Sequence, residues 1–458
     1  MRSEDRPRPG SVSLGGLLGW ALYDWAGNAF ATVVITFVFS AYFVDHVASD
    51  PTAGSTWWGL ALGAAGVLVA LSAPLLGAAL DQAGRRKPWL VGSTLVAVLA
   101  TAALVAVQPQ PGYAPLALIL VGVGVVGSEL AAVAYNSMLP ELVPPERTGR
   151  WSGLAWALGY AGGLVCLLLV LFGLVREGAW LALPRQEALH VRAAFPFSAA
   201  WYALFTLPLL LLTPDRARRG PGLRGALGRG ARQLRETWRA ARGHRPLIRF
   251  LLARMLYIDG VATIFAFGGV FAAGAVGLSG EDVLWFGIAM SVSAGVGAAV
   301  FAWVDEAIGA RRTILLALVG LALPGAGAVL TGSTGLFWAC ALLMGLFVGP
   351  VQSASRSYLA QAAPPQLRGE AFGLYAFSGK VTAFSGPLLV GGLTWLSGSQ
   401  RVGMSAVLLL LGAGFLLMLG TPEAGAVSGE RRAPPARALT AAGPAPPGGP
   451  GGRPHTGT

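Results

Sequence analysis

One apolar stretch, Trp20–Phe43, constrains the fold of this chain more than any other. It is long enough to cross a bilayer, because about 20 apolar residues at ~1.5 Å each span the hydrocarbon core. It nevertheless carries Asp24 and Asn28, four residues apart and therefore on one helix face. A carboxylate that faces lipid is energetically costly. This helix must turn its polar face toward a polar interior, which the rest of the chain has to supply.

The composition predicts that interior to lie within a membrane protein. Of the 458 residues, 54% are apolar and 12% are charged, whereas a soluble domain carries about 25% charged residues. We expect an all-α polytopic membrane protein with twelve transmembrane helices. The predicted spans, numbered 1 to 12, are 17–43, 57–80, 88–107, 114–139, 151–175, 194–213, 247–273, 283–304, 313–331, 335–359, 371–396 and 402–420.

Basic residues gather in the loops of one side. Arg85, Arg86 and Lys87 follow span 2, ten arginines lie in 214–246, and Arg311 and Arg312 follow span 8. The loop 176–193 is the exception, with three arginines on the opposite side. The positive-inside rule places both termini in the cytoplasm of a multi-pass protein of the cell (inner or plasma) membrane. The net charge of +12 then belongs to cytoplasmic loops, and we expect no nucleic-acid partner.

The chain contains an internal repeat. Residues 137–163 align without gaps on 357–383, at a shift of 220, with eight identities that include the paired prolines and several glycines. Such a repeat predicts two six-helix halves. The expected organisation is a cytoplasmic lead (1–16), an N-terminal half (17–213), a basic cytoplasmic linker (214–246), a C-terminal half (247–420) and a disordered cytoplasmic tail (421–458) rich in Pro and Gly.

The loop after span 2 carries a second pattern. Residues 77–87 read GAALDQAGRRK, in which Gly77, Asp81 and Gly84 precede Arg85, Arg86 and Lys87. This spacing resembles the loop motif of the major facilitator superfamily. The second copy, FAWVDEAIGARR, lacks the first glycine. Either Asp305 or Glu306 fills its acidic position, where register favours Glu306, and Arg311 and Arg312 follow. The resemblance implies that both copies form a conformational gate.

Three further segments narrow the resemblance. WALYDWAGNAF in span 1, GPVQSASRSYLAQAAP around span 10 and GEAFGLYAFSGK entering span 11 are similar to the branch of that superfamily that includes the yeast vacuolar amino-acid effluxer. The superfamily resemblance implies a central cavity between two halves, lined by spans 1, 4, 7 and 10, and transport by alternating access. The branch resemblance suggests amino acids as the substrate class.

Several polar side chains lie deep in the predicted spans, where contact with lipid would be costly. We expect Arg254, near the inner end of span 7, to reach the membrane interface. Two interpretations of the deeper residues stay open: they pair with one another to hold a state closed, or they also bind substrate or protons. Carboxylates facing cations suit a zwitterion. The candidate substrate- or proton-binding residues are Asp24, Asn28, Glu129, Asp259, Lys380 and Arg356.

These observations predict a secondary transporter of small solutes, amino acids or similar zwitterions, linked to protons, with export as the candidate direction. An exporter of drugs or other cationic amphiphiles is the alternative, and a lipid scramblase or membrane enzyme is the alternative of a different class. The chain has no phosphate-binding Gly-Lys-Ser/Thr loop, no metal spacing among its four histidines and no Ser/His/Asp arrangement in the spans. We therefore expect no enzyme activity, cofactor or metal. We also expect the protein to be a monomer in the bilayer.

Overall fold

The computed structural model describes residues 12–83, 85–215, 245–364, 367–383 and 385–427. All regular structure in these residues is helical. Within them, eleven helical segments are long and apolar enough to cross a membrane. Most of the predicted lead, linker and tail lies outside the described residues, as does Gly84. The first residues of the predicted tail are ordered, however, and end in the short helix α17 (Ala424–Val427).

The first half begins at Ser13, whose hydroxyl accepts a hydrogen bond from the Gly16 amide and caps the first helix. Its first span, Leu14–Val47, is continuous but passes through two π-helical segments, η1 and η2. The main helices of this half are α1 (Leu14–Ala29), η1 (Phe30–Phe37), α2 (Phe39–Tyr42), η2 (Phe43–Val47), α3 (Pro51–Ala83), α4 (Lys87–Ala103), α5 (Ala114–Leu142), α6 (Thr148–Val170), α7 (Leu189–Arg192) and α8 (Ala194–Leu212).

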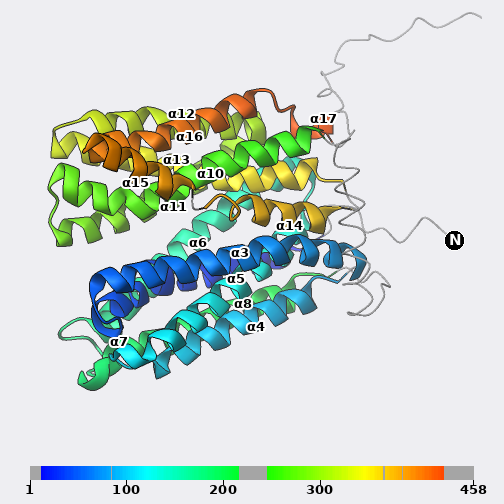
Figure 1. Cartoon of the computed structure of the whole chain (residues 1–458). Coiled ribbons are helices and arrows are strands. Elements are labelled where there is room, and N and C mark those ends of the chain that lie inside the picture. The colour runs from blue at the N-terminus through cyan, green and yellow to red at the C-terminus, as the bar shows by residue number, and fades with distance from the viewer. Residues whose placement is uncertain (1–11, 84, 216–244, 365–366, 384, 428–458) are drawn as a thin grey trace, which may run out of the picture.

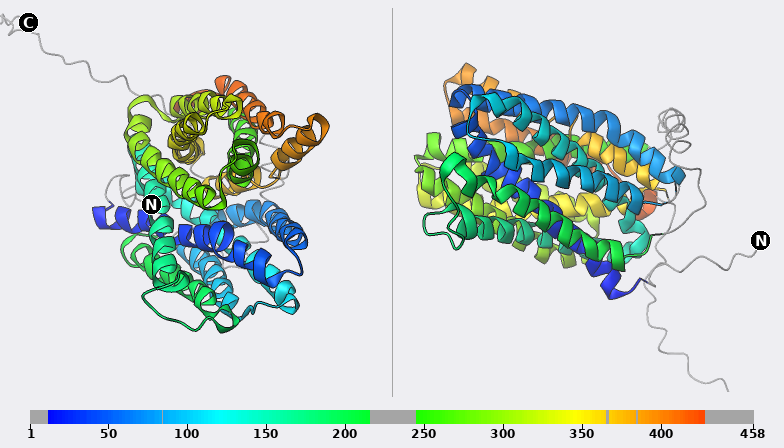
Figure 2. Two further views of the ribbon diagram at one scale, coloured as in Figure 1. Left: turned by 90° about the vertical axis from the view of Figure 1, so that its left-hand side faces the viewer. Right: turned by 90° about the horizontal axis from the view of Figure 1, so that it is seen from below.

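The second half repeats this plan. Its helices are α10 (Arg245–Phe271), α11 (Gly280–Ile308), α12 (Ala310–Leu330), α13 (Thr334–Ala362), α14 (Arg368–Ser378), α15 (Ser385–Ser397) and α16 (Gln400–Leu419). The two halves form two helix bundles that lie side by side, and both termini leave from the same end (Figure 1; Figure 2). We call this end, where the described chain starts and stops, the terminal end.

The predicted span 11 (371–396) is not one helix. It consists of α14 and α15, separated by consecutive turns over residues 379–383. Gly379 weakens the helix before the turns, and Pro387 cannot donate the amide that would continue it through Ala383. In the described residues, eleven helical segments are long enough to span a membrane, and the twelfth predicted span is divided into α14 and α15 in the segment that carries Lys380.

Small residues bring the halves together at the terminal end. A Cβ atom on Gly77 of α3 would collide with the backbone oxygen of Gly369 at the start of α14. A Cβ atom on Gly153 of α6 would lie 2.6 Å from that of Ala302 on α11. These two crossings, α3 with α14 and α6 with α11, are related by the repeat and close the space between the halves at this end.

Candidate functional site

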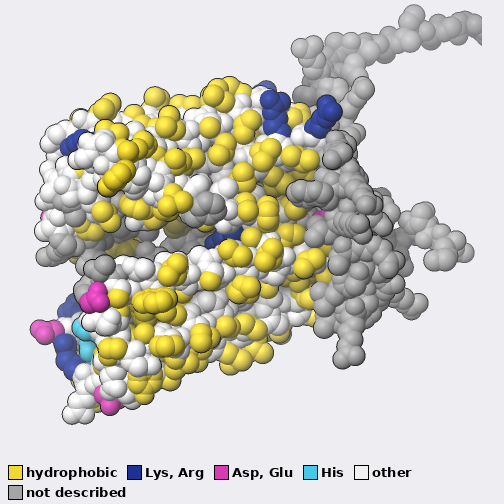
Figure 3. Space-filling view, in the orientation of Figure 1, with side chains coloured by type: hydrophobic (Ala, Val, Ile, Leu, Met, Phe, Trp, Pro, Cys, Tyr) yellow, Lys and Arg dark blue, Asp and Glu magenta, His cyan; other side chains and the backbone are white. Residues whose placement is uncertain are grey.

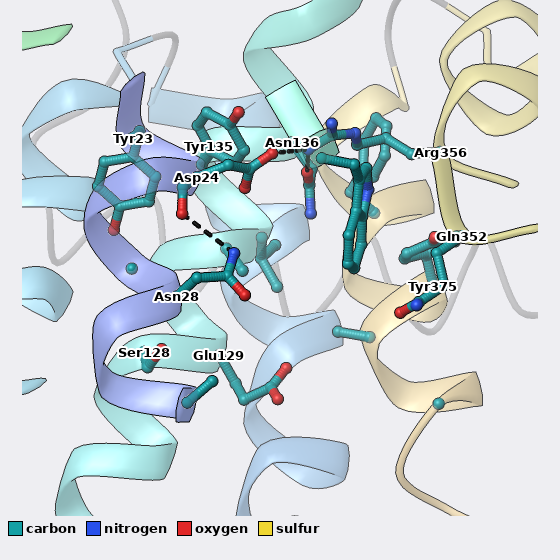
Figure 4. A pocket seen from close by; sticks show the side chains of 18 of the residues that line it. Tyr23, Asp24, Asn28, Ser128, Glu129, Tyr135, Asn136, Gln352, Arg356 and Tyr375 are labelled. Atoms are coloured by element: carbon teal, nitrogen blue, oxygen red, sulfur yellow. Dashed lines mark hydrogen bonds and ion pairs between the residues drawn. The ribbon is translucent and has the colours of Figure 1, made fainter. Parts of the chain in front are cut away.

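A polar cavity of about 320 Å³ lies between the halves (Figure 4). As expected, residues of spans 1, 4, 7 and 10 (helices α1, α5, α10 and α13) line it, and α6, α8 and α14 contribute as well. Its polar and aromatic lining consists of Tyr23, Asp24, Asn28, Ser128, Glu129, Tyr135, Asn136, Trp156, Tyr202, Arg254, Gln352, Arg356, Phe372, Tyr375 and Lys380.

The cavity opens away from the terminal end. A second cavity of about 300 Å³ shares Asn28 and Ala31 with the first and continues along α6, α10 and α11. Beyond it, the space-filling surface is hollowed between the two bundles on the side opposite the termini (Figure 3). The small-residue crossings close the terminal end. The structure is therefore a one-sided state, open at one end and closed at the other.

Arg356 and Asp24 form the more buried of two ion pairs that cross the cavity. Arg356 Nη1 lies 2.8 Å from Asp24 Oδ2 and donates to Asn136 Oδ1 at 3.2 Å. Its other nitrogens donate to the Ser152 hydroxyl at 2.9 Å and the Ser152 carbonyl at 2.7 Å. The ring of Trp20 lies 5.2 Å from the guanidinium. Arg356 is thus held by charge, hydrogen bonds and an aromatic face.

Glu129 and Lys380 form the second pair. Lys380 Nζ lies 2.7 Å from Glu129 Oε1, and both side chains are about one-third exposed to the cavity. In both pairs the acid belongs to the first half and the cation to the second. The pairing that the sequence left open is therefore Asp24 with Arg356 and Glu129 with Lys380 in this state. The Lys380 pair is the more exposed of the two.

Asn28 stays on the same face as Asp24. Its amide donates to the Asp24 backbone carbonyl at 3.0 Å, one turn back along α1 (Figure 4). On the opposite wall, a Cβ atom on Gly159 of α6 would lie too close to the Asn28 amide. Asn28 is therefore fixed against α6 at the mouth of the cavity, where it also borders the second cavity.

Two predicted positions differ in the structure. Asp259 does not line the cavity; its carboxylate lies at the start of α15, where it accepts hydrogen bonds from the Gly386 amide at 3.0 Å and the Ser385 hydroxyl. Arg254 does not reach the interface. It is 7% exposed and lines the cavity, with its guanidinium 3.4 Å from the centre of the Tyr375 ring. The expectation for Arg254 was wrong because it rested only on the depth of the residue in its span. The end of α14 provides buried hydrogen-bond acceptors for the guanidinium.

Sequence reasoning did not single out Trp156, Tyr202 or Ser152. The repeat could have indicated part of the site. Asn136 and Arg356 are also 220 residues apart, and they are hydrogen-bonded to each other. Trp156 likewise corresponds to Ala376, and both line the cavity. The hydroxyl groups of Tyr202 and Tyr23 form a hydrogen bond of 3.0 Å, and nothing in the sequence indicates that contact.

The predicted gate of the first half lies where α3 ends. Asp81 accepts hydrogen bonds from the amides of Gly369 and Glu370, each at 2.8 Å, at the start of α14 in the other half. Its carboxylate thus faces the positive end of a helix dipole. Arg86 pairs with Glu141 at 2.8 Å, and the Lys87 ammonium donates to the Leu210 carbonyl. Arg85 is exposed.

In the second half the structure corrects the predicted register. Asp305, not Glu306, occupies the place of Asp81: it is buried and touches Gly149 at the start of α6, as Asp81 touches the repeat-equivalent Gly369. Glu306 instead pairs with Arg150 at 2.5 Å near the surface. Asp305 lies three residues before the end of α11, whereas Asp81 lies two residues before the end of α3.

Arg311 and Arg312 bind the chain that follows the last span. Arg311 donates to the carbonyls of Leu419 and Thr421, at 2.7 and 2.6 Å. Both arginines lie near Glu423, at 3.8 and 3.5 Å. Asp215 plays the matching part in the first half, since it accepts from the amides of Arg86 and Lys87. Each basic motif thus anchors the chain at the end of its own half.

Solved structures of similar shape share the fold. The proton:xylose symporter XylE has a TM-score of 0.69 and 15% identity, and covers 89% of this chain with 96% of its own. The human organic anion transporter MFSD10 has a TM-score of 0.68 and 16% identity, over 88% of this chain and 99% of its own. These likenesses establish the major facilitator fold, with its two six-helix halves.

Sequence relatives are more specific. An uncharacterised MFS-type transporter of Bacillus subtilis, YxiO, is 26% identical over 409 residues, which are 88% of this chain and 94% of that protein. Autophagy-related protein 22 of Cryptococcus neoformans is 27% identical over 316 residues, 62% of this chain and 53% of the fungal protein. The family described as "Vacuole effluxer Atg22 like" matches residues 60–426. The chain therefore belongs to this family, as a multi-pass transporter of the major facilitator superfamily.

Proposed function

We propose that the protein moves small zwitterions, amino acids foremost, by alternating access. The observation that carries this proposal is the polarity of the two ion pairs: both acids come from the first half and both cations from the second, across one cavity of about 320 Å³. The α-ammonium of an amino acid is suited to replace a cation beside Glu129 or Asp24. Its carboxylate is suited to replace an acid beside Lys380 or Arg356.

In this proposal, the solute first displaces the partners of the Glu129–Lys380 ion pair. Glu129 and Lys380 are about one-third exposed to the cavity, whereas the Arg356 side chain is 3% exposed. A solute that separates Lys380 from Glu129 replaces each partner by its own group of the same charge. We propose a proton as the coupling ion, because two acids, Asp24 and Glu129, border the cavity. Asn28 then orients the solute at the mouth, beside Asp24.

Efflux is the proposed direction, in keeping with the description of the matching family as effluxers. We place the protein in the cell membrane with both termini in the cytoplasm, because the basic loops lie at the terminal end. The open end then faces outward. One chain contains both walls of the cavity, which supports a monomer as the working unit.

The gate is proposed at the terminal end. Gly77 permits the close crossing of α3 and α14, and Asp81 binds the start of α14. Asp305 takes the part of Asp81 in the second half. Gly84 and the basic residues of both copies, Arg85–Lys87 and Arg311–Arg312, complete the two motifs. Opening toward the cytoplasm requires these contacts between halves to break.

The test is transport by the purified protein in proteoliposomes, with labelled leucine, lysine, glutamate, a sugar and a lipophilic cation, each with and without a pH gradient. We expect amino-acid movement that the pH gradient accelerates. Lys380→Ala should reduce the initial rate about tenfold or more, since a charge-assisted hydrogen bond is worth that much, while folded protein remains. Arg185→Ala is the matched control, because its ion pair with Glu177 is exposed and lies outside the cavity.

Two results would overturn the proposal. Movement of the lipophilic cation alone would favour a drug exporter, and lipid scrambling without solute movement would exclude a transporter of this kind. An alkaline phosphatase fused after Thr458 tests the topology: activity of the fusion in the periplasm would contradict a cytoplasmic C-terminus.

A further inference from the structure

The interruption of span 11 is held at both ends by one helix, α10. Arg254 of α10 contacts the end of α14, and Asp259 of the same helix contacts the start of α15. Lys380 lies between these two ends. We infer that Arg254 and Asp259 are positioning residues, which hold the interruption so that Lys380 reaches Glu129 across the cavity. This inference rests on the proposed role of Lys380 in transport.

Arg254 holds the first end by charge and hydrogen bonds. Its Nη1 donates to the Tyr375 carbonyl and to the Ser378 hydroxyl, each at 2.7 Å, within the last turn of α14. The carbonyls of a last helical turn lack helix partners and carry the negative end of the dipole, so a cation is favoured there. The guanidinium also stacks on the Tyr375 ring. Arg254 therefore fixes where α14 stops.

Asp259 holds the second end with the opposite charge. Its Oδ2 accepts from the Gly386 amide and from the Ser385 hydroxyl, at the positive end of the α15 dipole. Asp259 is 4% exposed, so this carboxylate is stabilised by α15 rather than by water. A Cβ atom on Gly386 would collide with the Thr263 hydroxyl, and the absence of a side chain lets α15 approach α10 this closely.

The geometry of α10 sets the distance between the two ends. Arg254 and Asp259 are five residues apart, about 7.5 Å along a helix. Between the ends, the Lys380 amide bonds back to Phe377 at 3.0 Å and the Ala383 amide to Lys380 at 3.3 Å, in tight turns. Tight turns inside a span are typical of hinges. A tilt of α10 is thereby transmitted to Lys380, and through it to Glu129 in the other half.

Hydrogen exchange measured by mass spectrometry on the full-length protein in nanodiscs tests this inference without any solute. Two regions are followed: residues 379–390 around the interruption, and residues 125–136 of α5 around Glu129. In Asp259→Ala we expect exchange to rise roughly tenfold in both regions, since hydrogen bonds to a charged group are lost. Thr313→Val, which removes a buried hydroxyl bonded within α12, should change neither region.

The double variant Asp259→Ala/Lys380→Ala separates positioning from packing. A residue that acts through Lys380 should add nothing at α5 once Lys380 is gone. Asp259→Asn, which keeps the shape of its side chain, and Arg254→Gln, which keeps a shorter polar side chain, should give smaller rises in both regions. They carry the test if the alanine variant does not fold. An α5 region that exchanges as in the wild type while 379–390 loosens would overturn the inference. Because no transport is measured, this outcome is distinct from failure to transport amino acids.

Discussion

At the scale of single residues, Arg356 organises the site. All three of its guanidinium nitrogens have partners, and these partners come from α1, α5 and α6 of the opposite half. A cation so placed is stable only while its acid remains, because removing one member leaves an uncompensated buried charge. Asp24 and Arg356 thus link the stability of the closed terminal end to the charge state of the cavity.

A substitution at Asp24 tests that link. We expect Asp24→Asn to lower the free energy of unfolding by about 3 kcal/mol, the usual effect of breaking one side of a buried pair. The double variant Asp24→Asn/Arg356→Met should recover part of that loss, because no unpaired charge is left. Thermal unfolding of both variants in one detergent measures the difference. Equal stability of the two variants would show that the guanidinium is solvated after the acid is lost.

At the scale of elements, the two halves use one device twice. An acid near the end of a helix, Asp81 on α3 or Asp305 on α11, lies against a glycine at the start of a helix in the other half, Gly369 or Gly149. The glycine is required because any side chain would collide with the carboxyl group. The acidic motif therefore supplies one side of each contact. The other side is the glycine of the repeated segment at the start of α6 or α14.

Asp305 and Glu306 should behave differently when each loses its charge. Asp305→Asn is expected to slow turnover severalfold, as Asp81→Asn should, because both acids lie at crossings between the halves, Asp305 buried and Asp81 partly buried. Glu306→Gln should stay near wild type, since Glu306 and its partner Arg150 are 26% and 38% exposed. Initial rates at saturating and subsaturating solute measure the effects. A larger loss of turnover in Glu306→Gln than in Asp305→Asn would indicate that Glu306 is the equivalent of Asp81, as the sequence register predicts.

The close crossing at Gly77 makes a second prediction for this scale. Gly77→Val should force α3 and α14 apart, because even one added carbon collides with the Gly369 backbone. After Cys166 and Cys340 are replaced by Ser, a single cysteine at Ala376 reports the opening, since Ala376 lines the cavity. We expect faster labelling from the terminal end. Gly92→Val is the control, as nothing lies within 4 Å of a Cβ atom there; equal labelling of both would contradict the prediction.

At the scale of the whole molecule, the structure is one of the two states that alternating access requires. The terminal end is closed by two crossings related by the repeat, and the opposite end is hollowed between the bundles. The ion pairs lie between these regions and connect the halves. In the proposed cycle, motion of one half against the other changes the crossings and the pairs together, because both connect the two halves.

Locking one crossing should stop this motion. In the same cysteine-free background, cysteines at Gly153 and Ala302 are adjacent across α6 and α11, and a disulfide between them would hold the terminal end closed. We expect transport to fall to background under oxidation and to return on reduction. Each single cysteine should transport at the same rate in both conditions, whatever its added side chain costs in rate at this close crossing. Full transport by the cross-linked protein would mean that the halves do not separate at this crossing.

Much of this architecture follows from sequence patterns that act locally. Eleven of the twelve predicted apolar runs correspond to long apolar helices in the described residues, and the repeated segments contain the starts of α6 and α14. Asp24, Asn28, Glu129, Lys380 and Arg356 were all expected beside the cavity and all line it. These predictions succeed because the lipid bilayer forces an apolar length on each span and a protein-facing position on each charge.

Hydropathy and the internal repeat are enough to predict a membrane-spanning chain of two related halves with charges between them. The contacts between helices are needed to show that Asp24 meets Arg356 and Glu129 meets Lys380. They also show that Asp305 rather than Glu306 faces a helix start, and that Asp259 and Arg254 bracket an interrupted span. The physical reason is the same for each. Hydropathy and repeats record the depth of a residue along its helix, whereas pairing depends on how helices rotate and cross, and that is set by packing between segments far apart in the chain.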